Sequence, residues 1–258
     1  MISDDDLIEE KAVGWDEVSG AVSRSFDKWK LVDKDIRSFL NLTTRWAASK
    51  YEETWNASEQ EADIGNSANQ DTADEFSRRV EHLWPDDYNW MLRAAVVRDA
   101  VTAFEVYLEK SLDEVLARRA RVQVRRRRPH ESPPWHILVR GHGMIGNEVE
   151  TDRIKHIRAL RHTLTHQRGE LRTEEMRKKF AADIVLATDV DSGEEIWDRA
   201  YVGGKVQLTS DVVSVVLDDL GSAVRSADQR VWAIAWGRAA APQLDALREQ
   251  YERRSAPA

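Results

Sequence analysis

Apolar residues recur at steps of three and four along the first fifty positions, which is the spacing of an amphipathic helix. The clearest part of this pattern is Trp15, Val18, Val22, Phe26 and Trp29, and a looser part follows at Val32, Ile36, Phe39 and Trp46. We therefore expect a long N-terminal helix with at most one break. Residues 56–74 are polar and acidic, which predicts a loop or a disordered stretch.

A second helix is expected to begin at Pro85-Asp86-Asp87, because acidic residues are favoured in the first turn. It should run to about Ala120, since helical spacing is kept by Val97, Val101, Phe104, Leu108, Leu112 and Val115. Pro129, Pro133 and Pro134 then predict a loop. A third helix should cover Thr151 to His166, with Gly169 as its terminator.

The chain changes character after Glu175. Short β-favouring runs at Ile184-Val185-Leu186, Ile196–Tyr201 and Val206–Leu208, separated by turn residues, predict a small β-meander. Thr209-Ser210-Asp211 then supplies an N-cap for a final helix, which continues or restarts toward Trp236. The expected fold class is mainly α: an antiparallel helical bundle with a long N-terminal helix and a small β-meander insertion before the last helix.

Composition narrows the class of protein. The chain has no cysteine, which excludes disulfide scaffolds and thiol catalysis and suits a reducing compartment. Its acidic N-terminus lacks an apolar signal region, and no run of about 18 apolar residues is present. We therefore expect a soluble, cytoplasmic protein with no membrane partner. Ten tryptophans indicate extensive helix packing or a buried interface.

Charge is distributed unevenly along the chain. The net charge is −8, and eight acidic residues without a lysine or arginine lie between Tyr51 and Ser77. Seven arginines without an acid lie between Arg118 and Arg128. Such a run can steer a polyanion to one place, so Arg125, Arg126, Arg127 and Arg128 are candidate RNA-binding residues. The alternative is a solvated loop balanced by neighbouring helices.

The candidate chemistry lies in the segment Leu160–Glu170. Arg158, His162 and His166 are four residues apart and share one helix face, whereas Arg161 and His166 lie about 140° apart around the axis. Imidazole can take or give a proton near neutral pH, and a guanidinium matches the charge that develops on phosphoryl oxygens. RNA supplies an internal nucleophile, its 2′-hydroxyl. The segment therefore predicts metal-independent cleavage of RNA, with no cofactor and no metal.

The segment Arg161-His162-Thr163-Leu164-Thr165-His166 resembles the motif of the HEPN superfamily, helical domains of many prokaryotic toxins and antiviral ribonucleases. That motif is an Arg, four to six residues, then a His, with a polar residue directly after the Arg. The preceding helix also fits, because Ala103-Phe104-Glu105-Val106-Tyr107-Leu108 resembles the acid-bearing helix of these domains. The resemblance covers roughly residues 87 to 225.

The resemblance implies an endoribonuclease, a toxin or an antiviral defence effector, that acts as a homodimer around a shared cleft. By position, His166 would be the general acid or base, Arg161 would stabilise the phosphorane, His162 would assist, and Glu105 would orient one of them. Arg158 would be a further RNA contact. An antitoxin or other regulatory protein is a possible partner. On this basis the chain divides into residues 1–75, which pack on the bundle, a HEPN-like domain at 76–252, and a tail at 253–258.

Other interpretations are weaker. Gly141-His142-Gly143-Met144-Ile145-Gly146 follows the strand-like Ile137-Leu138-Val139 and matches a dinucleotide fingerprint, but the βαβ context is missing, so we expect a flexible loop. His162 and His166 have metal-ligand spacing without the companion Glu, and Asp189–Gly193 lacks the closing Glu of a calcium loop. The main alternative is a non-catalytic helical adaptor that dimerises or binds a protein partner.

Overall fold

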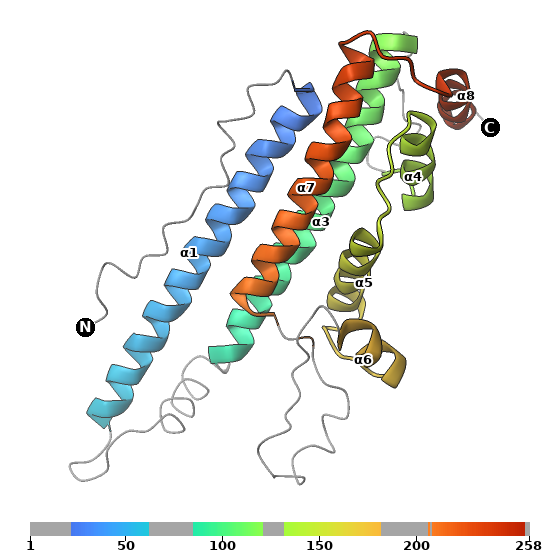
Figure 1. Cartoon of the computed structure of the whole chain (residues 1–258). Helices are drawn as coiled ribbons and strands as arrows, with labels where there is room; N and C mark the ends of the chain where they lie inside the picture. Colours follow the sequence, from blue (N-terminus) through green and yellow to red (C-terminus); the bar gives the residue numbers. More distant parts are fainter. Residues whose placement is uncertain (1–21, 62–84, 121–131, 182–205, 207, 256–258) are drawn as a thin grey trace.

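The computed structural model describes residues 22–61, 85–120, 132–181, 206 and 208–255 (Figure 1). Within these ranges the protein is helical and contains no β-strand. The α-helices are α1 (Arg24–Glu61), α3 (Pro85–Val115), α4 (Trp135–Met144), α5 (Asp152–His166), α6 (Glu174–Ala181), α7 (Ser210–Ala235) and α8 (Leu244–Ser255). A π-helical turn, η3 (Leu116–Ala120), continues α3.

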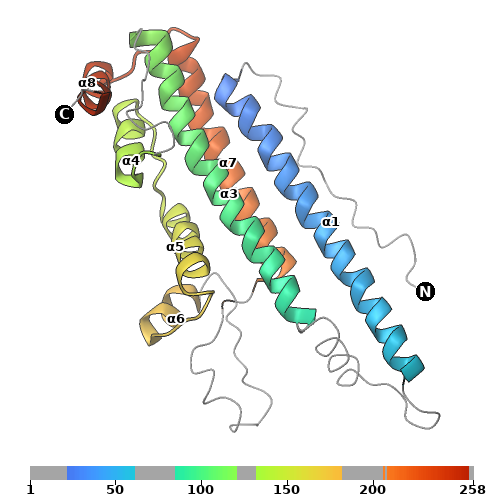
Figure 2. The ribbon, with the colours of Figure 1, turned by 180° about the vertical axis from the view of Figure 1, so that it is seen from behind.

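The three long helices α1, α3 and α7 lie side by side, and the shorter α4, α5 and α6 lie on the side of α3 away from α1 (Figures 1 and 2). Helix α1 is antiparallel to α3, because its first amides contact Glu114 while Trp46 near its other end packs on Tyr88. Helix α7 is parallel to α3, since Arg93 bonds Ser210 and Glu114 bonds Trp236. The mainly helical fold class is confirmed.

Helix α3 forms the centre of the core. The six apolar residues that predicted it are all 0% exposed, namely Val97, Val101, Phe104, Leu108, Leu112 and Val115. Burying each of these large side chains contributes roughly 1.5–3 kcal/mol relative to leaving it in water. The predicted span to about Ala120 is confirmed, with its last turn π-helical.

A buried polar cluster joins the three long helices. The backbone amide and hydroxyl of Ser23 donate to the carboxylate of Asp228 on α7, and the Tyr107 hydroxyl on α3 also donates to it at 3.2 Å. Burial raises the pKa of Asp228 even though these hydrogen bonds favour its charged form. Ser23 also accepts from the amide of Phe26, so it caps the first turn of α1.

Two predicted elements are wrong in type. Residues 56–61, expected in the acidic loop, form the last part of α1. Ile137-Leu138-Val139, strand-like in sequence, lies in α4 together with Gly141 and His142 of the expected flexible loop. A Cβ atom at Gly141 would lie 2.7 Å from the Leu112 side chain, so this glycine allows α4 to pack closely on α3. Most of the expected flexible loop is therefore the last turn of a helix, in which Gly141, His142 and Met144 are buried.

In the C-terminal half of the chain, some predicted elements agree with the structure and others do not. Thr209 caps α7 as expected, since its hydroxyl accepts the amide of Val212. The final helix is nevertheless α8, which runs through Arg253 to Ser255 where a tail was expected. Helix α6 was not predicted. Most of the expected β-meander, residues 184–205, lies outside the described residues; Val206 makes one backbone bridge, to the segment after α5.

Candidate functional site

Helix α5 presents the candidate residues on its outer face. The hydroxyl of Thr151 accepts the amide of Ile154 and so begins the helix at the expected position. Its inner face is buried against the core through Ile154, Ile157, Leu160, Thr163 and Leu164. This burial fixes the rotation of the helix about its axis, so that His162 and His166 are both exposed.

The end of α5 is held by a tight backbone turn. Gly169 has a φ of 79°, and a Cβ atom there would lie 2.3 Å from the Trp90 ring. Its carbonyl accepts the Val206 amide at 2.9 Å, and the Trp90 indole donates to the Val206 carbonyl at 2.7 Å. The predicted terminator role of Gly169 is thus explained, because only glycine fits both the left-handed conformation and the contact.

His162 and His166 form an imidazole pair. Their ring centroids lie 4.6 Å apart with an angle of 47° between the ring planes. This distance follows from their spacing of four residues, which places them one turn apart on the same face. Both rings are open to solvent, so a substrate can reach them. The two groups that the sequence nominated for proton transfer therefore lie together.

Arg161 lies on the adjacent row of α5 and is half-buried. Its Nε atom is buried and has no hydrogen-bond partner among the described residues. A buried guanidinium N–H without a partner is costly, and a bound anion would satisfy it. In this structure the Arg161 side chain makes no hydrogen bond to His166.

Glu105 on α3 pairs with Arg158 of α5. Its carboxylate accepts the Nε–H of Arg158 at 3.0 Å, and among the described residues it bonds neither Arg161 nor His166. The Arg158 guanidinium also stacks on Trp135, with its Cζ atom 3.8 Å from the ring centroid. Arg158, nominated as an RNA contact, is therefore engaged in joining α5 to α3 and α4. The sequence did not predict Trp135 and Trp90 as part of the site, because contacts between helices that are far apart in the chain leave no local sequence pattern.

The nominated basic run Arg125–Arg128 lies outside the described residues. One described cation close to the imidazole pair was missed, namely Arg168, which is exposed and has a φ of 52°. A positive φ is uncommon for a residue other than glycine. The turn at Gly169 therefore directs a further arginine outward, two residues beyond His166.

None of the helices in the described part of the chain is both long enough and apolar enough to cross a membrane. Among the same residues, no three side chains of His, Asp or Glu gather as ligands for a metal ion. No protein-family model, curated protein sequence or solved structure matches this chain.

Proposed function

We propose that the protein is a metal-independent endoribonuclease, a toxin or defence effector, whose site is formed by His162, His166 and Arg161. The observation that carries this proposal is the exposed imidazole pair, with its rings 4.6 Å apart at the end of α5. Imidazole acts as a base when neutral and as an acid when protonated, so two adjacent rings can supply both roles. The HEPN resemblance of the same segment supports the assignment.

The reaction would proceed through the RNA 2′-hydroxyl. A neutral imidazole takes the 2′-hydroxyl proton as O2′ forms a bond to phosphorus, and the P–O5′ bond breaks. A protonated imidazole gives its proton to the departing O5′. The products are a 2′,3′-cyclic phosphate and a 5′-hydroxyl. The guanidinium of Arg161, which is half-buried on the row beside the histidines, would donate to the phosphoryl oxygens as their charge increases. Arg168 and the Arg125–Arg128 run would contact neighbouring phosphates.

The experiment is a cleavage assay on a synthetic single-stranded RNA in the presence of EDTA, with DNA of the same sequence alongside. RNA alone should be cut, because DNA lacks the nucleophile. His166→Ala should reduce the rate by about 10²–10⁴-fold, the usual contribution of a general acid or base. His136→Ala is the matched control, since His136 is also an exposed histidine but lies on α4. If His166→Ala cuts RNA as fast as the wild type, the assignment is wrong.

A specific observation also favours the second function, a dimerising adaptor. Helix α1 exposes a row of large apolar side chains: Leu31 (62%), Val32 (44%), Phe39 (43%), Leu42 (66%) and Trp46 (57%). These positions fall within an arc of about 100° around the helix axis, opposite the buried Phe26, Trp29 and Leu40. Apolar surface gathered in this way is typical of protein-binding faces. A homodimer or a regulatory protein would cover it.

A further inference from the structure

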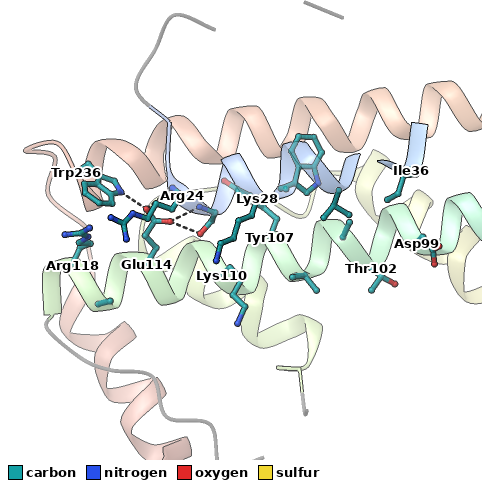
Figure 3. A pocket seen from close by; sticks show the side chains of 16 residues that line it. Arg24, Lys28, Ile36, Asp99, Thr102, Tyr107, Lys110, Glu114, Arg118 and Trp236 are labelled. Atoms are coloured by element: carbon teal, nitrogen blue, oxygen red, sulfur yellow. Dashed lines mark hydrogen bonds between the residues drawn. The ribbon is translucent and has the colours of Figure 1, made fainter. Parts of the chain in front are cut away.

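A groove runs between α1 and α3 (Figure 3). Helix α5, which carries the imidazole pair, lies on the other side of α3 (Figures 1 and 2). Its volume is about 700 Å³, which is within the range of small-molecule sites. Its lining surface is predominantly apolar, and the apolar contributors include Trp29, Val32, Ile36, Ala103 and Val106. Along α3 the lining extends from Asp99 to Arg118, a length of about 28 Å at the usual helical rise. The groove is thus long and mostly apolar.

Positive charge gathers toward one end of this groove. Arg24, Lys28 and Lys110 line it together with Arg118, whereas the acidic lining residues are Glu114 and Asp99. Figure 3 places Arg24, Arg118 and Glu114 around Trp236 at one end, and Asp99 near Ile36 toward the other. An anion is therefore favoured at the Trp236 end and disfavoured at the Asp99 end.

The arginines at this end stack on an aromatic ring. The Cζ atom of Arg118 lies 3.6 Å from the Trp236 ring centroid, and that of Arg24 lies 5.3 Å from it. Among the described residues, neither guanidinium forms an ion pair, and the same holds for the ammonium of Lys28. Stacking leaves the N–H groups at the edge of a guanidinium available, so both can still bind an anion.

Glu114 does not neutralise these cations by pairing with them. Its carboxylate accepts four hydrogen bonds, from the backbone amides of Arg24 and Ser25, the Ser25 hydroxyl and the Trp236 indole. A carboxylate offers about four lone-pair sites, so its acceptor capacity is filled. Burial alone would raise the pKa of Glu114, but hydrogen bonds, first those from Ser25 and Trp236, lower it. The carboxylate is therefore ionised and directed at the first turn of α1.

We propose that this groove binds a single-chain lipid anion, with its hydrocarbon chain along Val32, Ile36 and Val106 and its head group at Arg24 and Arg118. A compact anion such as inorganic phosphate would leave the apolar length of the groove in water. An uncharged chain would leave the two guanidiniums without a counter-charge. An extended chain with one anionic end meets both requirements, because burying its methylene groups and pairing its head group act together.

The test uses the full chain and palmitate below its micelle concentration, measured by isothermal titration calorimetry. Palmitate should bind saturably with one site per chain. Hexadecanol, which has the same chain length without the charge, should bind at least about tenfold more weakly, as expected for the loss of one charge-assisted interaction. Absence of saturable palmitate binding overturns the proposal, and equal binding of the alcohol overturns the assignment of an anionic ligand.

Two variants and two matched controls locate the site. Val106→Glu introduces a negative charge at a position 43% exposed in the groove, and Val215→Glu introduces the same charge at a position 45% exposed on α7, outside it. Arg118→Gln removes a head-group cation, and Arg45→Gln removes an exposed cation of α1 that does not line the groove. The first member of each pair should weaken palmitate binding at least about tenfold, and the second should leave it unchanged. Equal effects within a pair overturn the assignment.

Discussion

The carboxylate of Glu114 accepts the indole N–H of Trp236 and, through the same two oxygens, the first amides of α1. One side chain of α3 therefore joins the end of α7 to the beginning of α1. Helix N-termini carry amides without intrahelical partners and a partial positive charge, so an ionised acceptor is well suited to this place.

Glu114→Gln should lower the free energy of unfolding by about 1–3 kcal/mol, because an amide nitrogen replaces one acceptor and leaves donors without a partner, those of the part-buried Ser25 hydrogen bonds among them. Urea unfolding would measure the change. Glu53→Gln is the matched control: Glu53 is exposed on α1 and pairs with Lys50 at 3.4 Å, so its loss should cost less than about 1 kcal/mol. Equal losses in the two variants would show that Glu114 is an ordinary surface carboxylate.

Gly169→Ala should destabilise the protein and disturb the end of α5. The added methyl group would lie 2.3 Å from Trp90, and alanine is strained at a φ of 79°. A loss of about 1–3 kcal/mol in unfolding free energy is expected. Gly143→Ala is the control, since a Cβ atom there has no neighbour within 4 Å, and that variant should lose no stability. A Gly169→Ala protein as stable as wild type would contradict the close contact.

His142 should make the protein sensitive to mild acid. Its ring is 0% exposed, and burial lowers its pKa from 6.5 to about 4, despite the hydrogen bond to the Leu108 carbonyl. Between these pH values the unfolded chain binds more protons than the folded chain, so acidification lowers stability. Burial raises the pKa of Asp113 from 3.8 to about 6. Between these pH values the folded chain binds more protons than the unfolded chain, so acidification raises the stability through Asp113 while it lowers it through His142.

Replacing His142 separates its effect on the pH dependence of stability from that of Asp113. His142→Gln removes only the acid-sensitive contribution, so its stability relative to the wild type should improve as the pH falls from about 6.5 toward 4, by at most about 1.4 kcal/mol per pH unit. Unfolding free energies of both proteins at several pH values would give this difference. A difference that stays constant across the range would show that His142 does not titrate on unfolding.

Substitutions of Arg161 separate the contribution of its planar guanidinium from that of its positive charge. Under the ribonuclease proposal, Arg161→Lys keeps the positive charge but loses the planar fork and the Nε–H, so kcat should fall by about tenfold or more while RNA affinity changes less. Arg161→Gln should lower both. Single-turnover cleavage and separate binding measurements distinguish these effects. Arg140→Gln, an exposed arginine of α4, is the matched control, and an effect as large as that of Arg161→Gln would remove the special role of Arg161.

The exposed face of α1 predicts self-association. Leu42 is 66% exposed, the most exposed residue of the apolar row, so Leu42→Glu should convert a homodimer to a monomer in light scattering at micromolar concentration. Met91→Glu, at a residue 53% exposed on α3, should leave the oligomeric state unchanged. A wild-type protein that is strictly monomeric would contradict self-association through this face and would leave it to a different partner protein.

The sequence predicted the helices whose apolar residues keep a regular spacing and whose first turns carry a capping side chain. Helices α5 and α7 have both signals, at Thr151 and Thr209. Helix α4 was missed because β-branched residues and two glycines obscure a short helix whose stability comes from packing on α3. The last turns of α1 were missed because they are polar, and periodicity has no apolar residues to follow there.

Some contacts of the candidate site could likewise be predicted from the sequence, and others could not. The pairing of His162 with His166 follows from a spacing of four on one helix, so it could be predicted. The ion pair between Glu105 and Arg158 joins residues 53 positions apart, and sequence spacing carries no information about it. The groove between α1 and α3 is formed by two helices and the end of a third, so it becomes visible only after they have packed.

The capping of α1 has a consequence for how the chain is made. The first turn of α1 takes its acceptors from Glu114, 90 residues later than Arg24, and from Asp228, 205 residues later than Ser23. A nascent chain therefore carries α1 without its Glu114 acceptor until α3 has been made, and Ser23 without its Asp228 acceptor until α7 has been made. Such long-range closure is slow, and it makes the completion of this cap a step that follows the synthesis of α7. Until then the ribosome-bound chain exposes a surface that chaperones can bind.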